Sequence, residues 1–367
     1  MYPSFIVEYG VAPHHLSKEV FVGIVKWLRE TRVEAKHTGR KLEADALKIV
    51  INRIYGALND AMDYLYDPEC TYTVTINLQL LLCGLIEAFE LNNFDVLSAN
   101  TDGLLVRLPL NRQGVFKHIC NEWSAYSKLD LETEKFEKYC RSAVNDYIAV
   151  GYGFYDALQE YNRCGVWIDS KGNTYTTRQA IEDKFIKFKG YFLQDPEYNK
   201  GFVYPVVKKA LKEYFLYGVD ITEFIRNYIN TSRTAIYDYC FSQKVAGKYT
   251  TIYKTVRDGK PVYIKCQKHN RFYICKSGGG AITKAIVPDS DNIAYGDDIS
   301  GIVVEEEKSL VAGQRVALFN DYEYKEDYNL NYGFYINEAY KILYGNGKTG
   351  KGERRGINNN SNNLFGW

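Results

Sequence analysis

The stretch from Lys48 to Gly56, Lys-Ile-Val-Ile-Asn-Arg-Ile-Tyr-Gly, constrains this chain more than any other segment. It lies late in an apolar run with helical periodicity, so Lys48, Asn52 and Tyr55 fall on one face at spacings of four and three. A cation, an amide and a phenol therefore project together, and a glycine ends the run. This face is either a binding surface or the ordinary solvated side of an amphipathic helix, and the neighbouring stretches must decide between them.

A second helix is predicted immediately before this stretch, with Ser17 as its capping residue. Its expected packing face carries Val20, Ile24, Trp27 and Leu28. A different, basic face carries Arg29, Arg32 and Lys36. A turn signal at 37–39 then predicts an αα-hairpin, in which Arg32, Lys36 and Lys48 point at one anion. An ordinary charged hairpin would show the same spacing.

The segment Asp95–Arg107 alternates between apolar and polar stretches, which predicts a β-hairpin with Asn100-Thr101-Asp102-Gly103 at its bend. Asp-Gly also suits a tight turn with no further role. Upstream, Thr71–Thr75 is rich in β-forming residues and Leu78–Leu91 reads as a buried helix. The apolar run within that helix is interrupted by polar residues and is too short to span a bilayer, so we expect no membrane association.

Further strands are expected at Val144–Val150 and Phe185–Phe192. In the second, Lys187 and Lys189 share one face, which either follows a phosphate backbone or is the wet side of a sheet. The segment Gln267–Tyr273 mixes cations and aromatic residues, as nucleic-acid surfaces and polar hairpin loops both do. Helices are expected at 203–216, 221–229 and 336–343, followed by a low-complexity tail that should be disordered.

Composition sets broad limits on the function. Lys plus Arg number 46 and Asp plus Glu 45, so the net charge of +1 does not indicate a nucleic-acid binder, and any basic surface must come from uneven placement. The eight cysteines form no C-x-x-C pair, which favours free thiols in a reducing compartment over a structural zinc site. Because the N-terminus lacks a signal-peptide pattern, we expect a cytoplasmic protein.

The order of these pieces resembles family B DNA polymerases, especially those of viruses and phages. Tyr2-Pro3-Ser4 is similar to the end of the first palm motif, D-x-x-S-x-Y-P-S, and Asn100–Gly103 to the second palm motif, D-T-D followed by Ser or Gly. Lys48, Asn52, Tyr55 and Gly56 match the fingers motif K-x-x-x-N-x-x-Y-G, and Arg32 and Lys36 match its R-x-x-x-K. Tyr147 stands where the family often has K-x-Y.

This resemblance implies an α+β fold with an antiparallel palm sheet covered by helices, an α-hairpin as fingers and a mainly helical thumb. The expected divisions are the start of the palm at 1–16, fingers at 17–57, palm at 58–192, thumb and C-terminal subdomain at 193–346, and a tail at 347–367. By the same resemblance, we expect the family's N-terminal and exonuclease domains to be absent from this chain.

The resemblance also implies a DNA-directed DNA polymerase that adds dNTPs to a primer 3′-hydroxyl with two Mg²⁺ ions. Asp102 would bind metal, with Asn100 a possible second ligand. Arg32, Lys36 and Lys48 would hold the triphosphate, and Lys48 would protonate the pyrophosphate. Tyr2 would exclude a 2′-hydroxyl, and Asn52, Tyr55 and Gly56 would shape the nucleotide pocket. DNA contacts would come from Thr101, Gly103, Tyr147, Lys187, Lys189, Gly190 and Arg271.

Three departures from the family pattern qualify this expectation. The aspartate of the first palm motif would lie four residues before Met1, Asn100 replaces the first aspartate of D-T-D, and Asn145 replaces the lysine of K-x-Y. We therefore expect an N-terminal polymerase or exonuclease polypeptide as partner. The alternative is an inactive DNA-binding remnant or a truncated gene product.

Two further expectations follow from the resemblance. The apolar C-terminal tip with Leu364, Phe365 and Trp367 could bind a sliding clamp, although a simple unstructured end would have the same composition. If the chain is phage-encoded, it would act in the host cytoplasm.

Overall fold

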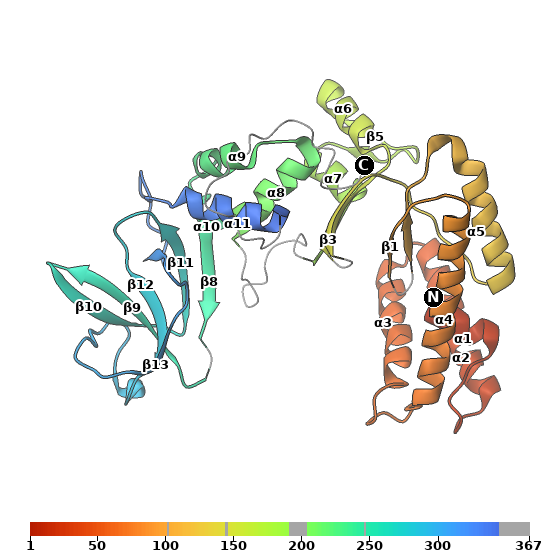
Figure 1. The fold of residues 1–367 in the computed structure, drawn as a ribbon, viewed down its shortest axis with the longest axis horizontal. Coiled ribbons are helices and arrows are strands. Elements are labelled where there is room, and N and C mark those ends of the chain that lie inside the picture. Colours follow the sequence, from red (N-terminus) through yellow and green to blue (C-terminus); the bar gives the residue numbers. More distant parts are fainter. Residues whose placement is uncertain (101–102, 144–145, 191–203, 246, 345–367) are drawn as a thin grey trace. The chain divides into compact units, whose positions relative to one another are not determined.

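The computed structural model describes residues 1–100, 103–143, 146–190, 204–245 and 247–344. The chain divides into two compact units, Met1–Glu134 (unit 1) and Lys135–Trp367 (unit 2), whose elements are labelled in Figure 1. The segment 58–192, expected to form one palm, is shared between these two units. Helices and antiparallel sheets occur in both units, as expected for an α+β chain.

Unit 1 is mainly helical and has one β-hairpin among its described residues. Its elements are α1 (Tyr2–Tyr9), α2 (Lys18–His37), α3 (Lys41–Ala57), α4 (Pro68–Leu91), β1 (Val96–Ala99), β2 (Leu104–Val106), the 3₁₀ turn η1 (Leu110–Arg112) and α5 (Gln113–Ser127). Helix α4 is its central element, because it packs on α1, α5 and β1 (Figure 1). The indole of Trp123 on α5 donates to the carbonyl of Leu81 at 2.7 Å and fixes that contact.

The extended segment predicted at Thr71–Thr75 is wrong, because these residues form the first turns of α4. The Asp67 side chain caps the helix by accepting from the Cys70 N–H at 2.9 Å, and Pro68 occupies the first turn, where a missing N–H costs nothing. Thr71 and Val74 are then buried against the core. The cap and this packing together outweigh the β preference of the segment.

Because α4 starts at Pro68, it is longer than the helix expected at Leu78–Leu91. Helix α4 has 24 residues, and by length and composition alone it is apolar enough to cross a membrane. The prediction that this run is too short to span a bilayer is therefore wrong. In the structure, 28% of its most apolar window is buried inside the protein.

The predicted αα-hairpin at 17–57 is confirmed, since α2 and α3 pack against each other and the Ser17 hydroxyl accepts from the Val20 N–H. The packing face predicted for α2 is wrong, because the buried row is shifted by one residue from Val20, Ile24 and Trp27. Val20, Ile24 and Trp27 are 61%, 50% and 62% exposed. The buried row is Phe21, Val25, Leu28 and Ala35. Two apolar rows lie side by side on α2, and the buried row is the one that places the small Ala35 on the packed side.

Unit 2 begins with a three-stranded antiparallel sheet in the order β3-β4-β7. The elements of its first part are β3 (Phe136–Ala143), β4 (Asp146–Gly151), α6 (Phe154–Cys164), β5 (Trp167–Ile168), β6 (Thr174–Tyr175), α7 (Arg178–Phe185) and β7 (Ile186–Lys189). One face of the sheet carries Cys140, Ile148, Val150 and Ile186 and packs into the main core of the unit. The strands predicted around 144–150 and 185–192 are confirmed within the described residues as β4 and β7.

The rest of unit 2 contains two more sheets and four helices among its described residues. The helices are α8 (Pro205–Tyr217), α9 (Ile221–Asn227), α10 (Ile236–Tyr239) and α11 (Tyr332–Tyr344), with 3₁₀ turns η3 (Tyr228–Asn230) and η4 (Ser290–Asn292). The strands are β8 (Cys240–Lys244), β9 (Thr250–Arg257), β10 (Lys260–Cys266), β11 (His269–Cys275), β12 (Ala281–Ile286), β13 (Glu305–Ser309) and β14 (Arg315–Leu318). The three helices predicted from the sequence here correspond to α8, α9 and α11.

Within 193–346, expected as the thumb and C-terminal subdomain, the strands between 240 and 318 form sheets β10-β9-β12-β13 and β14-β11-β8. The two sheets meet at Gly280, whose backbone pairs with Val316 in both directions at 2.8 and 2.9 Å. A Cβ on Gly280 would lie 2.2 Å from the Lys254 carbonyl, so only glycine permits this approach. The segment 267–273, for which a nucleic-acid surface and a polar hairpin loop were both open, is mostly strand β11, which pairs on its two sides with β8 and β14.

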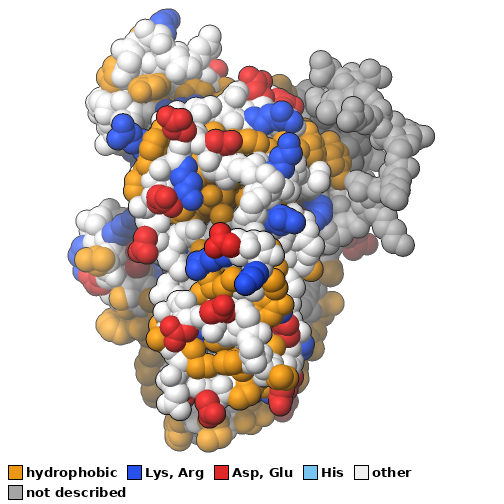
Figure 2. All heavy atoms as spheres, turned by 90° about the vertical axis from the view of Figure 1, so that its left-hand side faces the viewer, with side chains coloured by type: hydrophobic (Ala, Val, Ile, Leu, Met, Phe, Trp, Pro, Cys, Tyr) orange, Lys and Arg blue, Asp and Glu red, His pale blue; other side chains and the backbone are white. Residues whose placement is uncertain are grey.

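Charges of both signs are mixed on the molecular face shown in Figure 2, where Lys and Arg are interspersed with Asp and Glu. Among the C-terminal strands, Lys248 pairs with Glu306 at 2.9 Å and Lys254 with Glu307 at 2.6 Å. A surface with such mixed charge gives little long-range attraction for a polyanion. A basic binding surface must therefore be sought elsewhere in the described residues.

We predict that Asp67→Ala destabilises the chain by about 1–2 kcal/mol at pH 7, because the cap of α4 is lost. Burial alone would raise the pKa of Asp67, but hydrogen bonds from the Cys70 and His14 N–H groups and from the His14 ring lower it to about 2. Since the folded pKa lies below the unfolded value of about 3.9, this stabilisation is present above pH 4 and lost as the pH falls toward 2.

The hydrogen bond to Asp67 raises the pKa of His14. The stabilisation from the charged His14–Asp67 pair is therefore present below about pH 6.5 and lost as the pH rises through the folded pKa of His14. The penalty of Asp67→Ala should thus be largest near pH 5. Urea unfolding between pH 3 and 8 measures it. Asp45→Ala, at an exposed position on α3, is the control and should change stability little. Equal penalties at pH 3 and pH 5 would contradict the assignment.

Candidate functional site

Arg32 lies in the packed row of α2, one turn from Leu28 and one turn from Ala35. Its side chain is half-buried, and its Nε is fully covered and has no hydrogen-bond partner within the described part of the chain. A buried N–H without an acceptor costs about 1–3 kcal/mol. This position therefore favours an acceptor that comes from outside the described residues, such as a bound anion.

Lys36 and Lys48 are exposed, and neither has a carboxylate within 4.0 Å among the described residues. Other cations of the same hairpin are paired with carboxylates: Lys26 with Glu30, Arg29 with Asp130, Arg40 with Glu34 and Glu43, and Arg53 with Asp60 and Asp63. Lys18 and Lys41 are also unpaired in the described part, near the first residues of α2 and α3. All three predicted triphosphate ligands thus lie on one hairpin and keep their positive charge available.

Tyr2 and Tyr55 are brought together by α1 and α3. Their rings are stacked, with centroids 4.0 Å apart and planes 2° from parallel. The Tyr55 hydroxyl is also 2.7 Å from the Thr75 hydroxyl on α4, so the ring is held from both ends. The resemblance implied that both tyrosines lie near an incoming nucleotide, and the structure places them in direct contact.

Asn52 and Gly56 are exposed on the same helix as Tyr55. The space around Gly56 is open, since a Cβ there would meet nothing within 4 Å. No contact within the described chain therefore explains the glycine.

The predicted β-hairpin at Asp95–Arg107 is confirmed as the antiparallel pair β1–β2. At its bend the Asn100 N–H donates to the Gly103 carbonyl at 3.0 Å, and a Cβ on Gly103 would lie 3.4 Å from the Asn100 amide oxygen. Thr101 and Asp102 lie outside the described residues, so their predicted roles are untested. Among the described residues no group of three His, Cys, Asp or Glu side chains could hold a metal ion. Asn100 alone does not make a Mg²⁺ site, which needs carboxylates and near-octahedral oxygen ligands.

In unit 2, the sheet β3-β4-β7 has a second face opposite its core face. Tyr147 pairs with Lys189 across the strands, and Ala149 pairs with Lys187, so the two lysines and Tyr147 share this face. The register of β3 adds Tyr139, opposite Ala149, and Arg141, opposite Tyr147. Tyr139 and Tyr147 are stacked at 4.9 Å, and the amino group of Lys187 lies 5.9 Å from the Phe136 ring. This aromatic-basic face has the composition used to bind single strands and phosphate backbones.

Tyr139 and Arg141 were not predicted as site residues from the sequence. The signal in the sequence is weak, because Cys140 is the only buried residue of the segment 136–141, and its neighbours Tyr139 and Arg141 are half-buried. These residues could be assigned to a face only once the pairing with β4 was known.

Gly190 and Arg271 are two further described residues that the resemblance implies as DNA contacts, and the structure does not test that role. Gly190 follows β7 with φ of 67° and is exposed. Arg271 is in β11 and its guanidinium stacks on Tyr237 at 4.9 Å, which gives it a role in packing. The C-terminal tip with Leu364, Phe365 and Trp367, and Asn145 of the K-x-Y comparison, lie outside the described residues.

Among known proteins, the chain resembles solved structures by its fold. No family model matches the chain, and no curated protein matches it. The chain is similar to the family B DNA polymerase from the hyperthermophilic archaeon Pyrobaculum calidifontis, with a TM-score of 0.46 and 12% sequence identity. The match covers 94% of this chain and 44% of that polymerase, so the chain spans less than half of its length. At this TM-score the likeness assigns neither function nor site residues.

We predict that the stack of Tyr2 on Tyr55 contributes a coupling energy of about 0.5–1.5 kcal/mol, as aromatic pairs do beyond their buried area. A double-mutant cycle with Tyr2→Ala, Tyr55→Ala and the double variant, followed by urea unfolding, isolates this term from the hydrogen bond to Thr75. Tyr55→Phe is the control, since it keeps the ring and removes the hydroxyl. Additive effects of the two alanine substitutions would show that the rings do not interact in solution.

Proposed function

We propose that this chain is part of a DNA-directed DNA polymerase of family B type, which adds dNTPs to a primer 3′-hydroxyl. In this proposal α2 and α3 are the fingers, the β1–β2 hairpin belongs to the palm, and unit 2 continues the palm and carries the thumb. The proposal joins the ordered motifs of the sequence to the local geometry of each unit. A viral or phage origin, action in a host cytoplasm and clamp binding through the C-terminal tip remain predictions from the resemblance.

The observation that carries the proposal is the set of available cations on one helical hairpin. Arg32, Lys36 and Lys48 occupy the motif positions, and none has a carboxylate within 4.0 Å in the described part of the chain. The buried Nε of Arg32 lacks an acceptor. A triphosphate supplies several oxygen acceptors and a high negative charge, so it satisfies all three cations at once.

In this arrangement the three cations bind and orient the triphosphate, and they stabilise the charge that develops as pyrophosphate leaves. Lys48 is the proposed proton donor to the pyrophosphate, since an ammonium group carries a transferable proton and a guanidinium holds its proton too tightly. The stacked Tyr2 and Tyr55 form the floor of the nucleotide pocket. Tyr2 would exclude a 2′-hydroxyl by contact with the sugar.

Two Mg²⁺ ions remain part of the proposal through Asp102, which lies outside the described residues. The described donors do not suffice, so we derive no catalytic step through a metal ion. A further carboxylate must come from elsewhere, which is the reason to propose an N-terminal polypeptide as partner. When bound, such ions activate the primer hydroxyl and neutralise the leaving group.

The aromatic-basic face of unit 2, formed by Tyr139, Arg141, Tyr147, Lys187 and Lys189, is the proposed primer-strand surface. Cations on one side of a sheet neutralise phosphates, and aromatic rings accept bases or sugars without regard to sequence. The rings of Tyr139 and Tyr147 are half-buried, so each presents only part of its surface to a strand. A polymerase needs this tolerance because it must hold every primer.

The second candidate function is a DNA-binding remnant without catalytic activity. It is favoured by one observation, namely that no group of three metal-ligating side chains exists among the described residues. Primer extension decides between the two. The chain is assayed with a primer–template, dNTPs and Mg²⁺, alone and with a polypeptide that supplies the D-x-x-S segment. Extension in either case supports the polymerase, and DNA binding without extension in both supports the remnant.

We predict that Lys48→Ala weakens binding of a dNTP by about 10-fold to 100-fold, because a charge-assisted hydrogen bond contributes about 1.5–3 kcal/mol. Equilibrium dialysis with a labelled dNTP measures the dissociation constant, with and without Mg²⁺. Lys41→Ala is the matched control, since Lys41 is an exposed and unpaired lysine on the same helix. An equal loss in both variants would indicate only a general charge effect.

We predict that the double change Lys187→Glu and Lys189→Glu weakens binding to a primer–template duplex and lowers the salt dependence of log K by about 2, one for each phosphate contact. Fluorescence anisotropy of a labelled duplex, measured at salt concentrations from about 50 to about 300 mM, gives the slope of log K against log salt concentration. The control is Lys171→Glu with Lys260→Glu, two exposed lysines of unit 2 away from this face. An unchanged slope in the test variant would remove these lysines from the DNA contact.

A further inference from the structure

The outer face of α4 is apolar and is not covered by the other described residues of unit 1. Its residues Tyr72, Ile76 and Leu80 are spaced by four and are 62%, 51% and 63% exposed. The buried row on the same helix is Thr71, Val74, Leu78, Leu82, Leu85 and Phe89. At 100° per residue these two rows lie on opposite sides of the helix. A helix that is apolar all round is normally covered all round, and here one side remains open.

Gly84 continues the exposed row one turn beyond Leu80. It is exposed, and a Cβ at this position would meet nothing within 4 Å. Glycine in the middle of a helix is less stable than alanine, and no contact in the described chain requires it. A position without a side chain on a helix surface allows a second helix to approach closely, with side chains of one packing into the grooves of the other.

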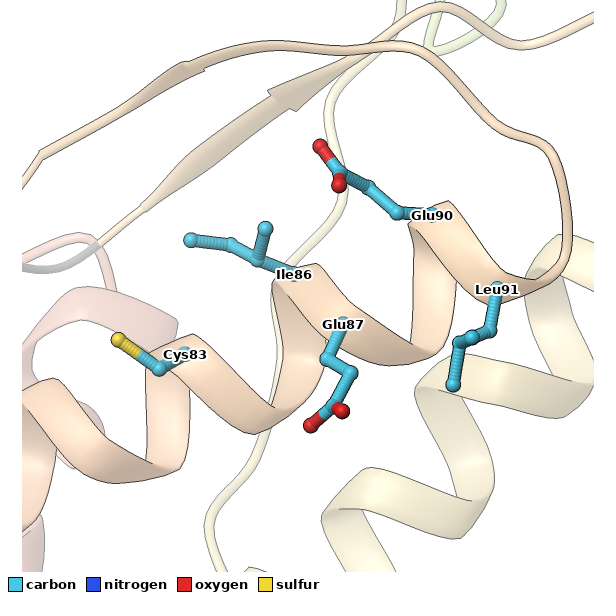
Figure 3. Close-up of a pocket in the computed structure, with 5 residues that line it drawn as sticks. All are labelled: Cys83, Ile86, Glu87, Glu90 and Leu91. Atoms are coloured by element: carbon cyan, nitrogen blue, oxygen red, sulfur yellow. The ribbon is translucent and has the colours of Figure 1, made fainter.

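The C-terminal end of this face is acidic. An open groove of about 460 Å³ lies there, lined by five residues of α4 (Figure 3): Cys83, Ile86, Glu87, Glu90 and Leu91. Neither Glu87 nor Glu90 has an ion-pair partner among the described residues, and α4 contains no Lys or Arg. Carboxylates near a helix C-terminus oppose the helix dipole. Cations from another molecule would relieve both the repulsion and the missing pairs.

We propose that the outer face of α4 is a docking site for a helical segment of a partner polypeptide. This segment is apolar where it meets Tyr72, Ile76 and Leu80, crosses α4 closely at Gly84, and carries Lys or Arg where it meets Glu87 and Glu90. The proposal is independent of the polymerase activity, since it rests on the surface of one helix alone.

Two observations favour a protein segment over a lipid bilayer as the occupant. The only charged residues of α4 are the acidic Glu69, Glu87 and Glu90, and the anionic surface of a membrane attracts Lys and Arg and repels carboxylates. The opposite side of α4 is packed into the core of unit 1, so lipid could not surround the helix. Moreover, 18 of the 27 exposed large apolar side chains among the described residues belong to unit 1, the shorter unit. Unit 1 is therefore the part that a partner most needs to cover.

The test uses two synthetic peptides that form amphipathic helices with the same Leu-Ala face. One has three Lys residues at one end, and the other has Glu at those positions. Binding of each labelled peptide to the full chain is measured by fluorescence anisotropy. We expect the basic peptide to bind at least ten times more tightly. The double variant Glu87→Lys with Glu90→Lys should reverse this preference in favour of the acidic peptide.

Cys83 reports the location of the bound peptide. Cys83 and Cys164 are the exposed free cysteines of the chain, and only Cys83 lines the groove. The basic peptide should slow the reaction of Cys83 with a maleimide at least fivefold and leave Cys164 unchanged. Protection of both cysteines or of neither would overturn the proposal.

Variants of α4 separate docking from folding. Leu80→Lys should weaken binding of the basic peptide at least tenfold without changing the thermal midpoint of unfolding. The matched control is Leu42→Lys, at an 88% exposed leucine on α3. Gly84→Gln should raise the thermal midpoint of unfolding, because it removes a glycine from the helix interior. It should also weaken binding of the basic peptide at least fivefold. Equal effects of Leu80→Lys and Leu42→Lys, or tight peptide binding by Gly84→Gln, would overturn the proposal. So would binding of the chain to phosphatidylcholine vesicles that Leu80→Lys abolishes, which would identify a lipid surface instead.

Discussion

The carboxylate of Asp67 determines how unit 1 is built, because it starts α4 at a point where the sequence reads as a strand. It accepts from the Cys70 N–H at 2.9 Å and from the His14 N–H and ring at 2.8 Å, so it joins the helix to the loop that precedes α2. With its start fixed there, α4 presents one row of side chains to α1 and α5 and another to the outside. The stack of Tyr2 on Tyr55 and the hydroxyl contact to Thr75 both depend on this placement.

The candidate nucleotide site shows how a fold can hold charges ready for a ligand. Arg32 occupies a packed position of α2, where most residues are apolar, and its Nε is covered without an acceptor among the described atoms. The cost of this arrangement is paid when the chain folds. A bound anion then gains the full interaction, because the guanidinium is already oriented and partly dehydrated. Lys36 and Lys48 remain hydrated and add attraction over a longer range.

Local signals in the sequence predicted local structure well. Ser17 as a cap, the turn between α2 and α3, and the pairing of β1 with β2 depend on a few neighbouring residues, and the sequence predicts all three. The phase of α2 depends on α3, so the choice between the rows of Val20 and Phe21 could not be made from α2 alone. The start of α4 has a readable signal in Asp67-Pro68, but the β-forming residues that follow it favour a strand.

The site was predictable to a similar degree. The motif positions Lys48, Asn52 and Tyr55 are adjacent in the sequence and share a helix, so their common face follows from periodicity. The half-buried state of Arg32, the stack of Tyr2 on Tyr55, and the contribution of Tyr139 and Arg141 to a basic face depend on pairing between distant segments. Such pairing is specified by packing across the whole unit and not by any one stretch.

The close approach at Gly280 has a consequence for how the C-terminal strands move. Its two hydrogen bonds with Val316 join the sheet β10-β9-β12-β13 to the sheet β14-β11-β8. These bonds make it costly for one sheet to unfold by itself, since the hydrogen bonds that join it to the other sheet must break as well. The two sheets should therefore behave as one cooperative unit, with similar protection of their amides against hydrogen exchange. The strand region would then act as a rigid body, and flexibility would be concentrated in the segments that connect it to the rest of unit 2.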